Sequence, residues 1–447
     1  MLVVSLIVGI KSLRKVGSNL RTVGILTLGC KVNTYESEYI IHLLKENGYQ
    51  IKDFDDFCDV YIINTCTVTN TSDIKSRKMI RKAIRRNPDS CVVAMGCFIE
   101  ANKGFSIPGL DIVLGNKDKS KIIELLDEWF SNREEVRRLY PELPRTFEDM
   151  YISEFPGRTR AFVKIQDGCE NFCSYCIIPY VRGKCRSKDS DVVIKEITDL
   201  VRNGYQEVVL TGIHTGNYGV DLDTSFSELL KRIVHIEGLK RLRISSIEIT
   251  ELTDDVLEVI RDYPVVVNHM HIPLQAGSNH VLKLMNRKYD LDCYFHKIEE
   301  ILSIRPDMAI TTDVIVGFPG ESEEDFLETM ETCKKIGFAK IHVFPYSERK
   351  GTKAMELDGH VAPAIKKERA RRLLTLSKEL ECAYYDTFIG KEVEVLVEEV
   401  KNGKSYGHTD TYLHVEIEGE LPHNTFVTVV VQEVQYPYCI GEVSLLK

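Results

Sequence analysis

Three cysteines stand within eight residues of one another, at Cys169, Cys173 and Cys176. Spaced Cys-x3-Cys-x2-Cys behind Gly168, their thiolates can converge on one soft metal centre without long-range folding. A structural zinc site usually takes four ligands from two close cysteine pairs, and Cys185 is a candidate for the fourth. Three close cysteines are instead typical of a [4Fe–4S] cluster that leaves one iron open to a small chelating molecule.

Three further cysteines, Cys30, Cys66 and Cys97, each follow an apolar run that predicts a β-strand. The runs are 23–28, 59–65 and 91–95. Because the carboxyl ends of parallel strands face one crevice, these thiols can meet and hold a second [4Fe–4S] cluster. Cysteine is also a small hydrophobe that suits a strand end, which is how we interpret Cys58 and Cys91.

The elements that must position these thiols fall into an α/β pattern with a small β-barrel at the end. Strand–helix alternation at 21–131 predicts a doubly wound parallel sheet, and the proline-containing segment 132–157 predicts a linker. Six βα units at 158–382 predict a partial (βα)6 TIM-like barrel with active-site groups at the carboxyl ends of its strands. Alternating strands at 383–447 predict a small antiparallel barrel.

Composition indicates the cellular compartment and the kinds of partner that this chemistry would have. The chain has 447 residues, a net charge of −9 and 13 cysteines, several in metal-like spacing, which favours a reducing, cytoplasmic setting. Its apolar start is too short to span a bilayer, so we predict a disordered extension at 1–20 and no membrane association. Seven cations on the predicted helix 72–86 form either a solvated face or a local surface for a phosphate backbone.

From residue 20 onward the sequence resembles the methylthiotransferase family of radical S-adenosylmethionine (SAM) enzymes, which carry a C-terminal TRAM barrel. The motifs that carry the resemblance are Leu28-Gly-Cys-Lys-Val-Asn33 with Tyr35-Glu-Ser-Glu38, Asn64-Thr-Cys66, Gly96-Cys97, the loop of Cys169, Cys173 and Cys176, His271-Ile-Pro-Leu-Gln-Ala-Gly-Ser278, Met285-Asn-Arg287, Thr312 to Gly320 and Phe344 to Thr352.

The resemblance implies two [4Fe–4S] clusters and SAM as cofactors. The cluster at Cys169, Cys173 and Cys176 would chelate SAM and cleave it reductively to a 5′-deoxyadenosyl radical. The cluster at Cys30, Cys66 and Cys97 would carry the sulfur that is methylated and inserted. The family also implies an electron donor and a sulfur source, neither of which the sequence identifies.

SAM contacts are expected at the cysteine loop and at strand ends, where ordinary turn chemistry is the alternative. The expected residues are Tyr175, Thr211, Gly212, Ser245, Ser246, Glu248, Val316 and Gly317. Asp313 and Arg182 are candidates for the same cavity. His269 and His271 alternate with apolar residues, so one of them is expected to be core.

The string Gly-Cys-Lys-Val-Asn-x-Tyr-Glu-Ser-Glu is similar to the branch that modifies threonylcarbamoyladenosine at position 37, in the anticodon loop of tRNA. The alternatives are the branch acting on isopentenyladenosine-37, enzymes acting on a ribosomal-protein aspartate, and a non-enzymatic iron–sulfur RNA-binding sensor. One departure concerns RNA binding, because 383–447 has 11 acidic residues against four lysines. RNA contacts are therefore expected on one face of that barrel (Lys391, Lys401, Lys404, His408, Tyr412), on the helix at 75–86 or on the run 366–372.

Overall fold

A computed structural model describes residues 20–444; the extension predicted at 1–20 lies almost wholly outside them. The N-terminal domain is a six-stranded parallel sheet with the order β2-β1-β3-β4-β5-β6. Its strands are β1 Thr22–Thr27, β2 Gln50–Lys52, β3 Val60–Thr65, β4 Cys91–Gly96, β5 Ile112–Leu114 and β6 Val136–Arg138. Its helices are α1 Lys31–Glu46, α2 Asn70–Arg86, α3 Cys97–Ala101 and α4 Ile122–Asn132, with the 3-10 turn η1 Lys119–Lys121.

The predicted doubly wound sheet is confirmed, and β3 and β4 are buried along their whole length, as their continuous apolar runs require. Strand order reverses between β1 and β3, and in open parallel sheets ligands bind at such a switch point. β2 was not predicted, and β6 forms inside the segment predicted as a linker, where it pairs with β5.

The second domain is the predicted partial barrel. Its strands are β7 Arg160–Lys164, β10 Glu207–Thr211, β11 Arg241–Ile244, β12 His269–His271, β13 Ala309–Val316 and β14 Lys340–Pro345. Its helices are α6 Ser190–Arg202, α7 Phe226–Ile233, α8 Asp254–Asp262, α9 Asn279–Leu284, α10 Leu291–Ile304 and α11 Glu323–Ile336, with 3-10 turns η2 Thr215–Asn217, η3 Ile249–Glu251 and η4 Lys353–Glu356. Two three-stranded parallel sheets are joined by single bridges from Leu242 to Val266 and from Ser246 to His271, so the barrel is open between β7 and β14.

Helix α12 (Pro363–Asp386) leads into the C-terminal barrel, which closes in the order β15-β16-β17-β19-β18. Its strands are β15 Glu392–Lys401, β16 Lys404–His408, β17 His414–Glu418, β18 Phe426–Gln435 and β19 Tyr438–Val443. The prediction of an antiparallel barrel holds except for β17 and β19, which pair in parallel. The barrel packs on the amino ends of the central strands, where Arg160 pairs with Glu398 at 3.0 Å and Arg241 with Glu394 at 3.2 Å.

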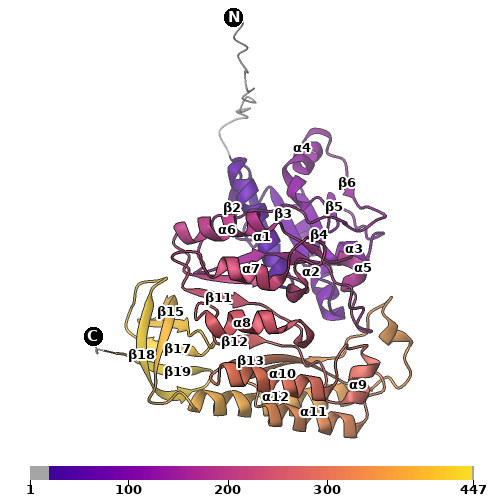
Figure 1. Ribbon diagram of the computed structural model, residues 1–447. Coiled ribbons are helices and arrows are strands. Elements are labelled where there is room, and N and C mark those ends of the chain that lie inside the picture. The colour runs from indigo at the N-terminus through magenta and orange to yellow at the C-terminus, as the bar shows by residue number, and fades with distance from the viewer. Residues whose placement is uncertain (1–19, 445–447) are drawn as a thin grey trace, which may run out of the picture.

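The N-terminal domain lies across the open side of the central barrel, and the C-terminal barrel lies at its end (Figure 1). On the β7 side, the Tyr35 hydroxyl of α1 donates to the carbonyl of Met150 at 2.7 Å. On the β14 side, Arg349 donates to Asn70 at 3.1 Å and pairs with Asp73 at 2.9 Å. Both edges of the open barrel are therefore bound to the N-terminal domain.

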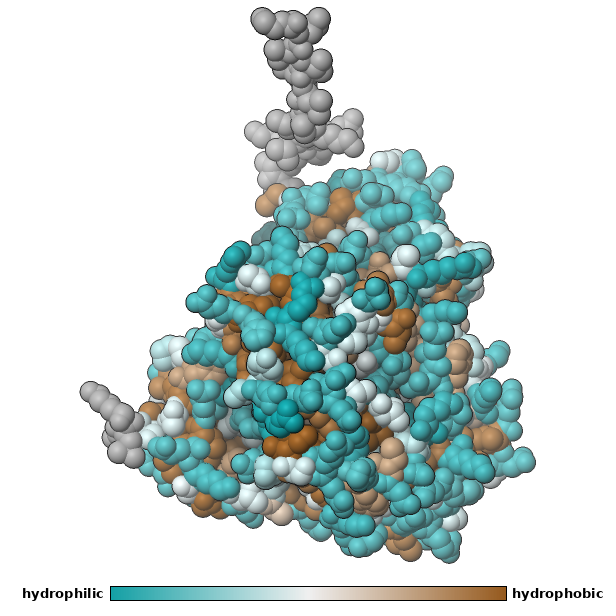
Figure 2. Space-filling model, in the orientation of Figure 1, coloured by the Kyte–Doolittle hydropathy of each residue, from teal (hydrophilic) through white to brown (hydrophobic). Residues whose placement is uncertain are grey.

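Hydrophilic residues cover most of the face in Figure 2, with hydrophobic patches between them. Within 20–444, no helix is long and apolar enough to cross a membrane.

Candidate metal centres and active site

Cys30, Cys66 and Cys97 come together at the switch point of the N-terminal sheet. They follow β1, β3 and β4, which are neighbours in the sheet. Gly29 has a φ of +110°, and a Cβ there would lie 3.2 Å from the Cys66 sulfur, so only glycine lets the β1–α1 turn approach so closely. Burial raises the pKa of the Cys66 thiol, and the nearby thiols of Cys97 and Cys30 raise it further.

The second trio lies in the loop between β8 (Gln166–Asp167) and α5 (Ile178–Arg182), which β9 (Arg186–Ser187) closes. Gly168 has a φ of +79°, and a Cβ there would lie 1.9 Å from the carbonyl oxygen of Lys184. The chain turns again at the third cysteine, where the Cys176 N–H donates to the Cys173 carbonyl at 2.9 Å. Burial raises the pKa of the Cys176 thiol to about 12, with the thiols of Cys173 and Cys169 adding to the effect.

Within 20–444, neither cysteine trio has the compact spacing of a single-ion site. Zinc bound to sulfur at about 2.3 Å would hold its sulfurs about 3.8 Å apart. Of all the histidine, cysteine and acidic side chains in 20–444, one group of three has every ligand atom within 4.8 Å, namely His271, Asp313 and His342. Each cysteine trio is thus wider than one ion requires, while its members remain electrostatic neighbours. Three neighbouring thiols at this wider spacing fit a [4Fe–4S] cluster with one open iron.

Cys185, the candidate for a fourth ligand, is buried, and its thiol donates to the Gly168 carbonyl at 3.8 Å. Arg287 is a neighbour that the sequence quoted without a role. Its guanidinium donates to the Cys173 sulfur at 3.3 Å and pairs with Glu248, one of the residues expected to contact SAM. A cation beside a thiolate favours its deprotonated, metal-binding form.

The two trios are close neighbours. Ile177 and Val181, which follow Cys176, pack against Cys97 in one small apolar cluster. The side-chain amide of Asn116 donates to the Val181 carbonyl at 2.9 Å and to the Cys97 sulfur at 3.5 Å. The loop of one trio therefore forms part of the wall of the other.

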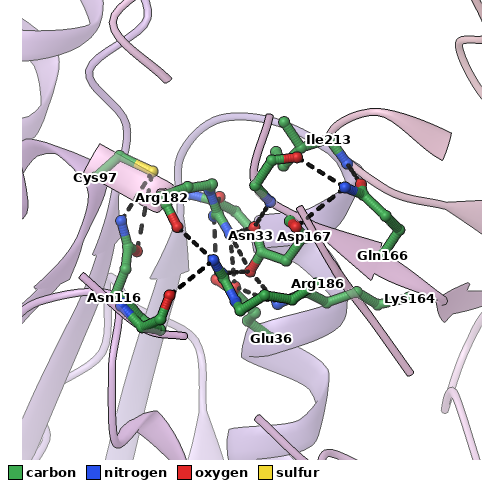
Figure 3. Close-up of polar contacts among 12 residues, drawn as sticks. Asn33, Glu36, Cys97, Asn116, Lys164, Gln166, Asp167, Arg182, Arg186 and Ile213 are labelled. Carbon is green, nitrogen blue, oxygen red and sulfur yellow. Dashed lines mark hydrogen bonds and ion pairs between the residues drawn. The ribbon is translucent and has the colours of Figure 1, made fainter. Parts of the chain in front are cut away.

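Near Cys97 lies a buried ionic network whose members include Asp167 and Arg182, on either side of the cysteine loop (Figure 3). Arg182, 1% exposed, donates to Asn33 at 2.8 Å and pairs with Glu36 and Asp167, each at 3.0 Å. Lys119, Lys164 and Arg186 supply further cations to the two carboxylates. Burial alone would raise the pKa of Glu36, but Arg182, Lys119 and Lys164 together hold it well below its usual range.

This network ties the N-terminal domain, through Asn33, Glu36 and Lys119, to the cysteine loop, through Asp167 and Arg182. The sequence suggested Arg182 as a cavity residue, but the structure surrounds it with protein. No role was predicted for Glu36 or Asp167 from the sequence, because buried partners so distant along the chain leave no local pattern.

The residues expected to contact SAM lie at the carboxyl ends of β10, β11 and β13 or in the cysteine loop. Tyr175 packs edge-on against Phe318 at 6.3 Å, and the Ser245 hydroxyl lies 3.1 Å from that of Thr215. Thr211 and Val316 are buried, and Ser246 is exposed. Gly212 has Gln166 3.0 Å from its Cβ position, and Gly317, with a φ of +71°, donates its N–H to Glu321. Their contacts with SAM stay predictions.

A parallel barrel with a Cys-x3-Cys-x2-Cys loop at the carboxyl end of its first strand defines the radical-SAM class. A model of the "Radical SAM superfamily" matches residues 163–333, and a model of "Uncharacterized protein family UPF0004" matches residues 22–115. A solved structure of the radical SAM methyltransferase TsrM from Kitasatospora setae aligns with a TM-score of 0.54 at 13% identity, covering 73% of this chain and 75% of that one. That likeness shows the fold alone.

Among curated proteins, the chain is 44% identical to the threonylcarbamoyladenosine tRNA methylthiotransferase MtaB of Bacillus subtilis, over 94% of this chain and 96% of that protein. It is 37% identical to the tRNA-2-methylthio-N(6)-dimethylallyladenosine synthase of Acetivibrio thermocellus, over 84% of this chain and 80% of that one. The chain belongs to the radical-SAM methylthiotransferase family. It is a transferase, and its class implies SAM and a [4Fe–4S] cluster.

Proposed function

We propose that the protein replaces the C2 hydrogen of threonylcarbamoyladenosine-37 in tRNA by a methylthio group. Two neighbouring cysteine trios, joined where Ile177 and Val181 pack against Cys97, are the observation that carries the proposal. One trio would hold the cluster that binds SAM, and Cys30, Cys66 and Cys97 would hold a second, sulfur-carrying cluster. Bound SAM and the clusters supply the radical and the sulfur, and the chain positions them around the base.

The substrate assignment is supported by the relatives. Four curated proteins named as threonylcarbamoyladenosine enzymes share 36–44% identity with this chain, and four named as dimethylallyladenosine enzymes share 36–37%. The N-terminal string points to the same branch. Dimethylallyladenosine-37 is the second candidate, because its enzymes align over nearly as much of the chain.

For tRNA binding, α2 is the surface we favour among those expected from the sequence. It begins just after Cys66, and its exposed cations include Lys75, Lys78, Arg81 and Arg85. In the 366–372 run, by contrast, Lys366 and Arg369 are buried, and Arg369 pairs with Glu321 at 2.6 Å.

The C-terminal barrel offers fewer free cations. Lys404 pairs with Glu416, and His408 and Tyr412 face the central barrel instead of the outside. An array of exposed cations at the mouth of the site would steer the phosphate backbone toward it.

The test is mass spectrometry of nucleosides from bulk tRNA of the source cells with and without the gene. Loss of the 2-methylthio derivative of threonylcarbamoyladenosine is the expected result. Loss of the methylthio group from isopentenyladenosine would transfer the assignment to the other branch, and unchanged tRNA would overturn the RNA substrate.

A further inference from the structure

A cleft of about 370 Å³ lies where the three domains meet, within the roughly 300–1,000 Å³ typical of small-ligand pockets. Alternate residues of the central strands line it, among them His269, Thr311 and His342. The intervening residues, such as Met270 and Ile341, are buried in the core under the helices. Because side chains alternate across a strand, the cleft lies on the inner face of the barrel.

The other two domains complete the cleft. Lys31, the first residue of α1, lines it from the N-terminal domain, directly after Cys30. Tyr412 and His414 line it from the C-terminal barrel. A group bound here would therefore lie beside the trio to which we assign the sulfur-carrying cluster.

Three polar groups of the cleft have no partner among residues 20–444. Lys31 is exposed and takes part in no ion pair or hydrogen bond there, and neither does the imidazole of His342. His269 is 9% exposed; one ring nitrogen lies 3.2 Å from the Thr311 hydroxyl, and its Nδ1 has no partner. Buried polar groups are nearly always hydrogen-bonded, so an orphaned nitrogen on a residue that lines a cleft points to a polar ligand.

The charges around the cleft favour an anionic ligand. Three carboxylates near the cleft already face a cation or an imidazole. Glu381 pairs with Lys340 at 2.9 Å, Glu398 lies 3.1 Å from His408, and Asp313 lies 3.3 Å from His271. Among residues 20–444, Lys31 is left as a cleft cation without a carboxylate partner.

We propose that this cleft is the receptor for the threonylcarbamoyl substituent, with Lys31 pairing with its carboxylate and His269 and His342 hydrogen-bonding its polar atoms. This inference rests on the proposed function and adds the residues that select the substrate. An isopentenyl group has no polar atom, so it would leave Lys31 and the His269 nitrogen unpaired, and a site built to pair polar groups rejects ligands that lack them.

The test compares two anticodon hairpins that differ in one group: one carries threonylcarbamoyladenosine, the other its neutral carboxamide. Binding to the iron-reconstituted protein is measured by fluorescence anisotropy, which does not depend on turnover. The variants are Lys31→Gln, Lys31→Arg and, as the matched control, Lys45→Gln at the exposed far end of the same helix. Iron content per chain is measured for each, because Lys31 adjoins Cys30.

For the unaltered protein we expect the acid to bind about tenfold more tightly than the amide, the size of one charge-assisted hydrogen bond. Lys31→Gln should bring that ratio close to one, while Lys31→Arg and Lys45→Gln keep most of it. Because both hairpins meet the same protein, a variant with damaged clusters still yields a valid ratio.

Two results would overturn the inference: an unaltered protein that binds acid and amide equally, or a Lys31→Gln variant that keeps the full ratio. Neither bears on the proposed function if the threonylcarbamoyl hairpin is still methylthiolated. Methylthiolation of an isopentenyladenosine hairpin alone would instead refute the proposed function itself.

Discussion

Replacing Glu36 by glutamine should destabilise the protein severely, because it removes one carboxylate from a buried ionic network. Lys119 is wholly buried, and within 20–444 its ion-pair partner is Glu36 alone. In the variant, Lys164 and Arg182 still pair with Asp167, at 2.7 and 3.0 Å, so Lys119 is the cation left without a partner. Breaking a buried pair on one side costs about 3–5 kcal/mol. At about 1 °C per kcal/mol for a chain of this length, we expect a drop in melting temperature of at least about 3 °C.

The matched control is Glu38→Gln on the same helix, whose partner Arg158 lies 3.1 Å away with a 42% exposed side chain. A pair exposed on one side contributes about 0–1 kcal/mol, so this variant should melt close to the unaltered protein. Adding Lys119→Met to Glu36→Gln should restore part of the loss, because the stranded charge is then removed. Thermal melting followed by circular dichroism measures all four proteins. Equal shifts for the two glutamine variants would refute the reasoning.

The destabilisation caused by Glu36→Gln should become smaller in acid. The pKa of Glu36 is lowered in the folded protein, so as pH falls the unfolded chain takes up this proton first. The stability that Glu36 contributes is full above about pH 4.3, its unfolded value, and is lost as pH falls toward its folded pKa. The gap in melting temperature between the unaltered protein and Glu36→Gln should therefore stay constant from neutral pH down to about pH 5 and narrow below about pH 4.3.

Three further predictions concern the clusters and the RNA surface. Gly168→Ala should lose iron from the loop trio, because the new Cβ would lie 1.9 Å from the Lys184 carbonyl oxygen. Gly204→Ala, also at positive φ but with no atom within 4 Å of its Cβ position, should keep its iron. The iron content per chain distinguishes the two variants. Cys66→Ala should halve the bound iron while Cys91→Ala, in the core of the sheet domain, leaves it unchanged, and equal iron in both would contradict a second cluster at Cys66. Arg81→Glu on α2 should weaken tRNA binding and lower the slope of log Kd against log salt by about one. Lys231→Glu, at an exposed position on α7, is the control. Identical slopes for the two variants would show that α2 is not part of the RNA-binding surface.

The parts of the fold that the sequence predicted are those with a local cause. Continuous apolar runs predicted β3 and β4, because a parallel strand covered on both faces has no polar side. The three-residue strand β2 is too short for any periodicity to show.

The candidate site follows the same rule: features with a local cause were predicted, and features that depend on packing between distant residues were not. The cysteines were predicted because their spacing or their place after strands is visible locally. Glu36, Asp167 and Arg182 form one network only because the N-terminal domain docks on the cysteine loop, more than a hundred residues away along the chain. Lys31 belongs to one of the motifs that carry the family resemblance, but the cleft that it lines forms only when the three domains pack together. Of the two alternating histidines, His269 is the more buried, as the expectation of one core histidine allowed.

The most direct measurement uses the reconstituted protein with SAM, a chemical reductant and two defined anticodon hairpins, one carrying threonylcarbamoyladenosine-37 and one isopentenyladenosine-37. Mass spectrometry of the digested hairpins reports where a methylthio group has been added. The account predicts 2-methylthio product from the threonylcarbamoyl hairpin, and none from that hairpin when Cys66 or Cys173 is replaced by alanine. Product from the isopentenyl hairpin alone, or undiminished product from the Cys66→Ala protein, would contradict it.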